Sequence, residues 1–420
     1  MLKLGLLLIG PAAFRKRWYV LTIVGFLVLL LGMLSVLRYI PGIEQAVILL
    51  LGLAFAVYGL ARTAMIIANG QMITAPAKLG YTLLAATFGT MIFLFAPVYG
   101  ARTLALMFAV LFLLDGLNRV IPAWLSRFPA WRELVVFSAM EFLLAIMLVL
   151  NWPFEADQNI TVSLALYLVL TGWLLLKTGL LLRNHEEEAA LLLLPIFGKR
   201  GWYDHAPVLL DHDPQKEIRD TPLTVYVWTP AGSANIKSRR PIVDRYLAAA
   251  DPEGNLSFGH VALGSPPDIY ISHYPEAESA HSAGNFVAAI SGRPEHHVPG
   301  IFKPSYAEEV ANWCNADERV TIHNVSTRRL RAFWAGYKQD STYNLVNRNC
   351  STLVAAALDA SVEGALSTPF PWLRLMRLLL TPDFWQAALV RSRAEAATWT
   401  PGLVLDYASP LARLLDRSHR

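Results

Sequence analysis

Six long apolar segments in the first half of the chain constrain its fold more than any other feature. The first of them, residues 18–37, contains twenty residues and no charged side chain. A helix of about twenty apolar residues can cross the hydrocarbon core of a bilayer. Hydrophobic residues make up 55% of the chain, so we expect a membrane protein with a soluble part. The sequence predicts six transmembrane helices, over residues 18–37, 45–61, 79–97, 103–117, 134–150 and 160–182.

The six segments form three copies of one hairpin, each with a proline in its turn. Pro41, Pro97 and Pro153 stand 56 residues apart, and residues 59–62 recur 57 positions later as residues 116–119, with Gly first and Arg last. Small residues at matching depths let helix backbones approach closely in lipid. Such residues precede each proline in register, at Gly32, Gly89 and Ala145. This arrangement resembles the HdeD-like small membrane proteins, and the resemblance implies a role in acid or general stress.

Basic residues are concentrated on one side of the predicted helical bundle. That side holds the cluster Arg15-Lys16-Arg17 and, further along, Lys3, Arg62, Lys78, Arg119, Arg127, Arg132, Arg183, Lys199 and Arg200. The other side has Arg38 and Arg102 together with Glu44, Glu155 and Asp157. Basic loops of membrane proteins remain in the cytoplasm. We therefore expect a multi-pass protein of the inner (cytoplasmic) membrane, with both termini and the soluble part in the cytoplasm.

A cysteine and two histidines in the second half of the chain carry the candidate chemistry. Cys350 follows Asn349, a good helix N-cap, and apolar residues then recur at helical spacing. The first turn of a helix favours a thiolate, the nucleophilic form of cysteine. His260 and His273 lie on two strand-like runs separated by the turn residues 264–267. A hairpin of these strands is expected to set the two histidines side by side.

The order His260, His273, Cys350 resembles the circularly permuted branch of the NlpC-type papain-like superfamily, which includes the lecithin:retinol acyltransferase-like proteins. The resemblance covers residues 221–362. It implies that Cys350 is the nucleophile, His260 its base and His273 the residue that orients this base. It also implies an α+β papain-like fold in which the cysteine helix packs on the sheet. Ser351-Thr352-Leu353 follow the cysteine where the acyltransferases have a charged and aromatic run, so their lipid substrate does not carry over.

These features divide the chain into five predicted regions. An interfacial lead-in over residues 1–17 precedes the six-helix transmembrane domain at 18–183. A solvated linker at 184–220 connects it to a papain-like catalytic domain at 221–362. The remaining residues, 363–420, form an amphipathic C-terminal tail that could lie on a membrane surface or pack against either domain.

Other residues compete for the functional roles, and we interpret most of them as structural. Cys314 lies on a predicted helix without a cap to lower its thiol pKa. Asp268 or Glu276 could orient His260 in place of His273. His296, His297 and His323 are expected at the surface, and Asp115, Glu141 and Lys177 are expected to be paired or close to helix ends. His205, Asp211, His212 and Asp213 lack the spacing of a metal site, so we expect neither a metal nor a cofactor.

Three functions follow from these patterns. The first is a membrane-anchored cysteine hydrolase that cleaves an amide or peptide bond through a Cys350 thioester. The second uses the same thiol on lipid acyl chains, as a phospholipase or acyltransferase. The third is a non-enzymatic, stress-related membrane protein with a sensor domain. The expected partners are the bilayer, a protein, peptide or acyl-lipid substrate, and a second copy of the chain; a net charge of +4 is too small to indicate nucleic acid.

Overall fold

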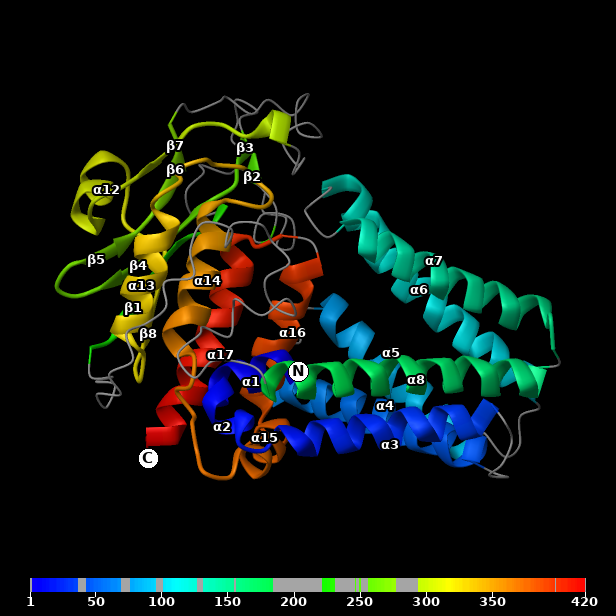
Figure 1. The fold of residues 1–420 in the computed structure, drawn as a ribbon. Coiled ribbons are helices and arrows are strands. Elements are labelled where there is room, and N and C mark those ends of the chain that lie inside the picture. The colour runs from blue at the N-terminus through cyan, green and yellow to red at the C-terminus, as the bar shows by residue number, and fades with distance from the viewer. Residues whose placement is uncertain are drawn as a thin grey trace. The chain divides into compact units, whose positions relative to one another are not determined.

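The computed structural model forms two compact units, which we describe one at a time (Figure 1). The helical unit comprises residues 17–120 and 135–184, and the mixed unit comprises residues 1–16, 121–134 and 185–420. The structure describes residues 2–36, 43–68, 76–95, 101–126, 131–154, 156–183, 221–230, 246, 249–250, 256–276, 294–396 and 398–419. The predicted linker at 184–220, with its histidines and aspartates, lies outside the described residues, as do Pro41 and Pro97.

Long helices build the helical unit. They are α3 (Trp18–Val36), α4 (Ile43–Ala68), α5 (Pro76–Phe95), α6 (Ala101–Ser126), α7 (Trp131–Leu150) and α8 (Ala156–Arg183). The predicted hairpins join consecutive helices, whereas the structure packs α3 against α8 and α4 against α5. A buried apolar cluster that includes Ile92, Phe108, Leu148 and Ile160 connects α5 through α8.

The prediction of six transmembrane helices is wrong. Among the described residues, two helices are long and apolar enough to cross a membrane: Trp18–Ser35 within α3 and Gln158–Leu180 within α8. The apolar runs of α5, α6 and α7 are only 10–17 residues long, whereas a bilayer core requires about twenty. The runs of α6 and α7 also contain charged residues, Asp115 and Glu141.

Small residues allow the paired helices to approach closely. A Cβ atom added to Gly32 of α3 would lie 2.9 Å from the carbonyl oxygen of Ala165, and one added to Gly89 of α5 would lie 2.1 Å from the backbone nitrogen of Ala56. Both positions therefore require glycine, as expected where helices associate by close backbone packing.

The helices α3 and α8 run antiparallel. Gly25 faces Gly172, whereas Gly32, further along α3, faces Ala165, which is earlier on α8. The guanidinium of Arg183 lies 5.0 Å from the ring centroid of Trp18, so the start of α3 and the end of α8 are adjacent. Both connections from this helix pair to the mixed unit therefore leave from one end of the pair.

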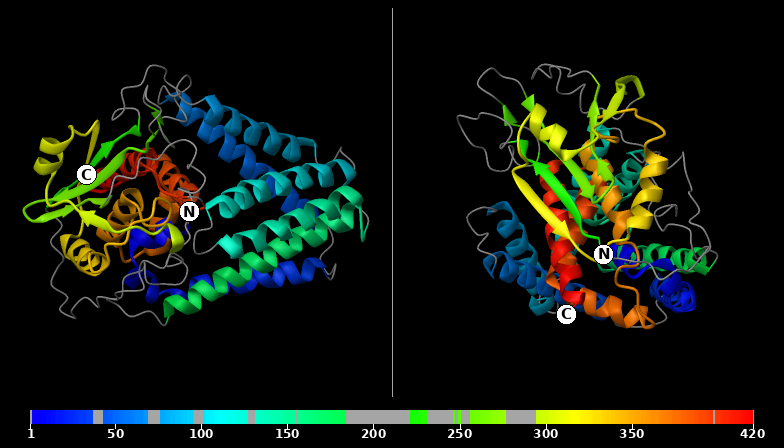
Figure 2. Two further views of the ribbon diagram at one scale, coloured as in Figure 1. Left: turned by 90° about the horizontal axis from the view of Figure 1, so that it is seen from above. Right: turned by 90° about the vertical axis from the view of Figure 1, so that its left-hand side faces the viewer.

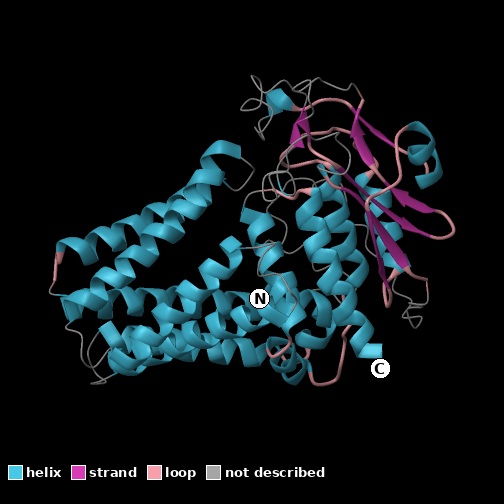
Figure 3. Cartoon of the chain, turned by 180° about the vertical axis from the view of Figure 1, so that it is seen from behind, coloured by secondary structure: helices cyan, strands magenta, loops and turns pink. Residues whose placement is uncertain are grey.

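A four-stranded antiparallel sheet with the order β5-β4-β1-β8 forms the centre of the mixed unit (Figure 3). The strands are β1 (Leu223–Trp228), β4 (His260–Ser265), β5 (Ile269–Ile271) and β8 (Glu318–Ile322). Two short ribbons accompany it, β2 (Ala249–Ala250) with β3 (Leu256–Ser257), and β6 (His273–Pro275) with β7 (Gly300–Phe302). Trp228 pairs with His260 across β1 and β4, and Leu263 pairs with Ile271 across β4 and β5.

Helices cover both faces of this sheet. The helices α14 (Cys350–Val362) and α17 (Pro401–His419) lie on one face and α12 (Tyr306–Asn312) on the other (Figure 1, Figure 2). The remaining elements are η4 (Pro294–His296), α13 (Thr327–Tyr337), α15 (Pro371–Leu379) and α16 (Pro382–Ala396). Because α17 contacts β8, β1 and β4, the predicted C-terminal tail is part of the same compact unit as the sheet.

A buried ionic cluster joins three of these helices. Asp359 of α14 lies 2.6 Å from the Nη2 atom of Arg391 in α16, and both side chains are buried. The Tyr407 hydroxyl of α17 donates to the second Asp359 oxygen at 2.6 Å. Both carboxylate oxygens of Asp359 thus accept hydrogen bonds from protein groups, which a charge buried away from water requires.

The predicted interfacial lead-in lies inside the mixed unit. The helix α1 (Leu2–Ile9) buries Leu6, Leu7 and Leu8, and it is followed by α2 (Pro11–Arg15). The backbone N–H of Gly364 donates to the Leu7 carbonyl at 2.9 Å. Apart from Lys3, α1 is apolar, which suits a core helix better than an interfacial one.

Candidate active site

The first turn of α14 presents Cys350. The Asn349 side chain accepts from the backbone N–H of Thr352 at 2.7 Å, and the Thr352 hydroxyl accepts from the N–H of Asn349 at 2.8 Å. This capping box ends the preceding turn and begins the helix at Cys350. The positive end of the helix dipole therefore lies at the sulfur.

The loop before α14, which carries the capping residue Asn349, is held in place by several polar contacts. The backbones of Asn344 and Arg348 exchange two hydrogen bonds, of 3.2 and 3.0 Å. The Arg348 guanidinium donates to the Thr342 carbonyl at 2.6 Å and lies 4.5 Å from the ring centroid of Tyr337. Arg348 is buried, and its charge is balanced by Asp340 at 3.4 Å. These contacts fix the position from which the cysteine helix starts.

His260 is the first residue of β4 and is held on both ring faces. The ring of Tyr274 stacks on it with centroids 3.9 Å apart, and Trp228 lies 5.4 Å away. The preceding Gly259 has φ +69°, and a Cβ there would lie 2.4 Å from the Trp228 carbonyl oxygen. Only glycine fits this conformation at this spacing. The aromatic rings and the strand leave His260 little freedom to rotate.

Two polar side chains bind one edge of the His260 imidazole. The Ser272 hydroxyl lies 3.0 Å from Nε2, and a carboxylate oxygen of Glu309 lies 3.7 Å from the same atom. The Ser272 hydroxyl donates to that carboxylate oxygen, and the Tyr270 hydroxyl donates to the other at 2.8 Å. Ser272 and Glu309 are buried. Because Nε2 is occupied, Nδ1 is the ring nitrogen left for the thiol.

Cys350 and His260 are both buried, and each shifts the pKa of the other. Burial raises the pKa of the Cys350 thiol, but the charge and hydrogen bonding of His260 and the Val261 backbone N–H outweigh it and lower that pKa. Burial lowers the pKa of His260, yet the charges and hydrogen bonding of Cys350 and Glu309 raise it to about 9. Both shifts favour the thiolate and the imidazolium over the neutral pair.

Glu309 remains a carboxylate in this site. Burial raises its pKa, but the hydrogen bond and charge of His260, followed by the hydroxyls of Ser272 and Tyr270, lower it below the usual value. A negative charge is thus held beside the imidazolium on the side away from the sulfur. This is the place of the third residue in a cysteine or serine catalytic triad.

The structure gives the orienting position to Ser272 and Glu309 rather than to His273. His273 hydrogen-bonds the Ser341 carbonyl through Nε2 at 2.9 Å and the Tyr337 hydroxyl through Nδ1 at 3.3 Å. Burial, followed by the charge of Arg348, lowers the pKa of His273 to about 4, although the hydrogen bond to the Ser341 carbonyl raises it, so His273 is neutral at pH 7. His273 therefore supports the loop before the cysteine instead of contacting the base.

Strand alternation explains the misplaced histidine. Leu263 pairs with Ile271 and Gly264 with Tyr270, and continuing this register sets His260 opposite Tyr274. Side chains alternate between the two faces of a sheet, so even-numbered residues of the second strand share the face of His260. Ser272 satisfies this condition, whereas His273 points to the opposite face.

The other sequence candidates lie elsewhere. Cys314 follows the end of α12 and is partly exposed, and burial together with Asp317 raises its thiol pKa. Asp268 is exposed and pairs with Arg331 at 2.8 Å, and exposed His323 lies 3.2 Å from Asp416. Neither Asp268 nor Glu276 contacts His260 through a described bond. His296 and His297 lie in and just after η4, and within the described ranges no three His, Cys, Asp or Glu residues gather as metal ligands.

Sequence reasoning missed Glu309. Ser305 caps α12 by accepting from the Glu308 N–H at 3.2 Å, so the helix itself was predictable. The role of Glu309 could have been inferred from the hairpin, because Tyr270 and Ser272 lie on the same face as His260. Once buried, these two hydroxyl groups need a polar partner. Which of the two adjacent acids, Glu308 or Glu309, would turn inward depends on how α12 packs on the sheet.

With this geometry established, we compared the chain with known proteins. No protein family, curated protein or solved structure matches it.

Proposed function

We propose that this chain is a membrane-anchored cysteine hydrolase of the permuted papain-like type that cleaves an amide or peptide bond. The observation that carries the proposal is the buried pair of Cys350 and His260, poised as thiolate and imidazolium at a helix start. Such a pair is costly to bury unless it is hydrogen-bonded, and strongly shifted pKa values of this kind concentrate at active sites.

In the proposed reaction, the Cys350 thiolate attacks the acyl carbon and forms a C–S bond. The carbonyl electron pair moves to oxygen, giving a tetrahedral oxyanion. As the C–N bond breaks, His260 transfers its Nδ1 proton to the departing amine, which leaves a thioester. Neutral His260 then accepts a proton from water, whose oxygen attacks the thioester and releases the acid and the thiolate. Glu309 stabilises the imidazolium in both steps.

Tyr343 is positioned to assist at the oxyanion. Burial and the charge of Cys350 raise the pKa of the Tyr343 phenol well above its usual value, while a hydrogen bond from the Cys350 backbone lowers it. The phenol is therefore neutral and lies at the N–H that begins α14. We assign the Cys350 N–H and the Tyr343 hydroxyl as donors to the developing oxyanion.

The same thioester can form on a lipid acyl ester, and one observation favours this second candidate. Among the described residues, two helices are long and apolar enough to cross a membrane, and in a bilayer such helices would be in contact with acyl lipids. The two candidates differ in the leaving group, which is an amine for a peptide and an alcohol for a lipid. His260 can protonate either.

The test is covalent trapping on the full chain. Peptide-like and acyl-lipid-like electrophiles are added in parallel to wild type, Cys350→Ala and Cys314→Ala, and the labelled peptide is identified by mass spectrometry. We expect label on Cys350 in wild type and Cys314→Ala, with the preferred probe identifying the substrate class. Equal labelling of Cys350 and Cys314 by every probe would instead support the non-enzymatic sensor.

Glu309→Gln should shift the pH dependence of turnover. The carboxylate is one of the groups that raise the pKa of His260 to about 9, so its neutral isostere lets that pKa fall towards the ordinary value. The alkaline limb of the activity profile then moves to lower pH, and kcat/KM at pH 8 falls about tenfold for each unit by which the pKa of His260 drops below 8. The measurement is a pH profile of kcat/KM. Asp268→Asn, an exposed carboxylate of the same unit, is the control and should leave the profile unchanged.

We also propose that the mixed unit lies in the cytoplasm. Two of the connections between the helical and mixed units leave from the end of the α3 and α8 pair where Arg183 meets Trp18. The basic cluster Arg15-Lys16-Arg17 stands at the same end, and basic flanks favour the cytoplasmic side. A C-terminal reporter active only in the cytoplasm should be active. A reporter active only outside that compartment would reverse the orientation.

A further inference from the structure

One side of α15 presents apolar side chains to solvent. Phe370, just before the helix, is 59% exposed, and Leu373, Met376 and Leu380 are 53%, 61% and 84% exposed. Residues spaced by three or four positions share one face of a helix. The opposite face is buried through Leu375 and Leu378, so α15 is anchored and its outer apolar face is rigid.

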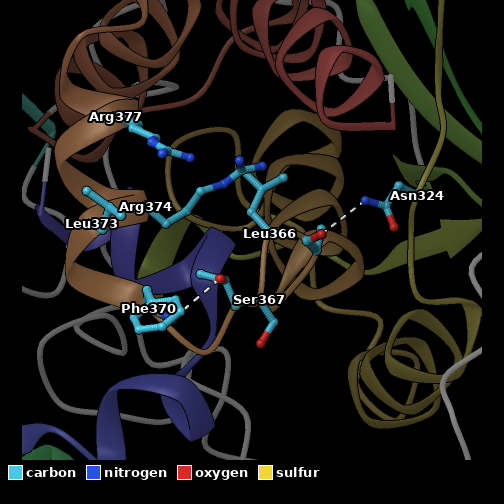
Figure 4. A pocket seen from close by; sticks show the side chains of 9 residues that line it. Asn324, Leu366, Ser367, Phe370, Leu373, Arg374 and Arg377 are labelled. Carbon is cyan, nitrogen blue, oxygen red and sulfur yellow. Dashed lines mark hydrogen bonds between the residues drawn. The ribbon is translucent and has the colours of Figure 1, made fainter.

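Two arginines flank a cavity beside this face. A cavity of about 440 Å³ is lined by Arg374, Arg377, Ser367, Thr368, Asn324 and neighbouring apolar residues (Figure 4). No carboxylate belongs to this lining. In the part of the chain that the structure describes, neither arginine forms an ion pair, and the buried Nε of Arg374 has no hydrogen-bond partner. The cavity therefore presents unneutralised positive charge and hydroxyl groups, which suits a phosphate.

A short connection links α2 to the apolar helix α3. Phe14 of α2 packs edge-on against Trp372 of α15, with ring centroids 4.9 Å apart. The apolar helix α3 begins at Trp18, and four residues of chain span at most about 14 Å. The basic residues Arg15, Lys16 and Arg17 lie within this short connection. The chain that follows Phe14 therefore carries the cations that an anionic membrane surface attracts.

We propose that the outer face of α15 docks on a bilayer leaflet rich in anionic phospholipid. Phe370, Leu373, Met376 and Leu380 enter the acyl region, and Arg374 and Arg377 hold the lipid phosphate at the cavity. Apolar residues interleaved with arginines are the pattern of an interfacial helix. This inference concerns how the mixed unit is seated on the membrane, and it holds whether or not Cys350 is catalytic.

The test uses the full chain in lipid nanodiscs. Backbone hydrogen exchange of residues 370–380 is followed in discs of phosphatidylcholine alone and in discs containing phosphatidylglycerol. We expect the exchange to slow about tenfold with phosphatidylglycerol in wild type, because two arginines each gain from an anionic surface. Arg374→Gln/Arg377→Gln should abolish this difference.

A matched control distinguishes the site from a general charge effect. Lys338 and Arg393 are exposed cations of the same unit outside the cavity, and Lys338→Gln/Arg393→Gln should keep the wild-type response. Equal exchange in the two kinds of disc, or an equal loss in both double variants, overturns the proposal. Protection by inorganic phosphate in detergent alone would also overturn it, because the cavity would then bind a free anion without a bilayer.

Discussion

Replacing His260 by alanine is expected to slow alkylation of Cys350 at pH 7 about a hundredfold. Burial alone raises the pKa of the Cys350 thiol, and the His260 imidazolium is the largest of the influences that lower it. Without that charge, the thiol pKa rises, and the thiolate fraction at pH 7 falls with it.

The measurement is iodoacetamide labelling of the full chain, with the modified peptides counted by mass spectrometry. Cys314 serves as the internal reference, because burial and Asp317 raise its pKa and His260 does not act on it. His323→Ala, at an exposed histidine, is the matched variant and should not change the labelling of Cys350. Wild-type Cys350 reacting no faster than Cys314 would refute the thiolate assignment.

The same ion pair predicts a pH dependence of stability. His260 has a folded pKa of about 9 against an ordinary value of 6.5. A raised histidine pKa contributes stability that is complete below pH 6.5 and is lost as the pH rises through 9. Glu309 acts in the other direction, since its lowered pKa contributes stability above its ordinary value of 4.5 that is lost in acid. The free energy of unfolding of wild type should therefore fall more than that of His260→Ala when the pH is raised to 9.

The second large effect is expected at Asp359. Asp359→Ala removes an ion-pair partner of buried Arg391 and a hydrogen-bond acceptor of the Tyr407 hydroxyl, both held at 2.6 Å. Breaking a buried ion pair on one side costs about 3–5 kcal/mol, because the remaining buried charge loses that compensation. The mixed unit should melt about 10 °C lower, since each kcal/mol shifts the midpoint of a domain this size by about 2–4 °C.

Thermal unfolding followed by tryptophan fluorescence measures this effect. Asp359→Leu/Arg391→Met replaces the pair by apolar residues of similar volume and should recover most of the loss. Asp416→Ala breaks an exposed pair with His323 and should change stability by less than about 1 kcal/mol. An Asp359→Ala midpoint equal to that of Asp416→Ala would mean that the cluster does not hold α14, α16 and α17 together.

Local sequence patterns predicted the start of the cysteine helix well. Asn349, Cys350 and Thr352 form the cap that their identities indicate, because capping depends on neighbours within one turn. The prediction that His273 orients His260 was wrong for an equally local reason. A shift of one residue along a strand moves a side chain to the other face of the sheet. Glu309 was missed because it reaches His260 through α12, whose packing no local pattern reports.

In the helical unit, the apolar pattern of the sequence predicted where helices lie but not how they pack. Periodicity located long helices near the six apolar segments, but it did not distinguish a bilayer span from a helix that packs within a bundle. The pairing of α3 with α8 spans more than 120 residues and depends on Gly25, Gly32 and Gly172 meeting small partners. The repeat in the sequence predicts the hairpins α3–α4, α5–α6 and α7–α8, whereas the structure packs α3 against the distant α8 and α4 against α5.

The position of α1 has a consequence for how the protein is made. Leu7 and Leu8 accept hydrogen bonds from Gly364 and Leu366, so about 350 residues must be synthesised before this contact can form. At about 5–20 residues per second, the ribosome needs roughly 20–70 s for that stretch. During that interval a largely apolar helix lacks these partners in its own chain. The nascent protein is therefore expected to need a chaperone or the membrane surface to shelter α1 until residues 364–366 emerge.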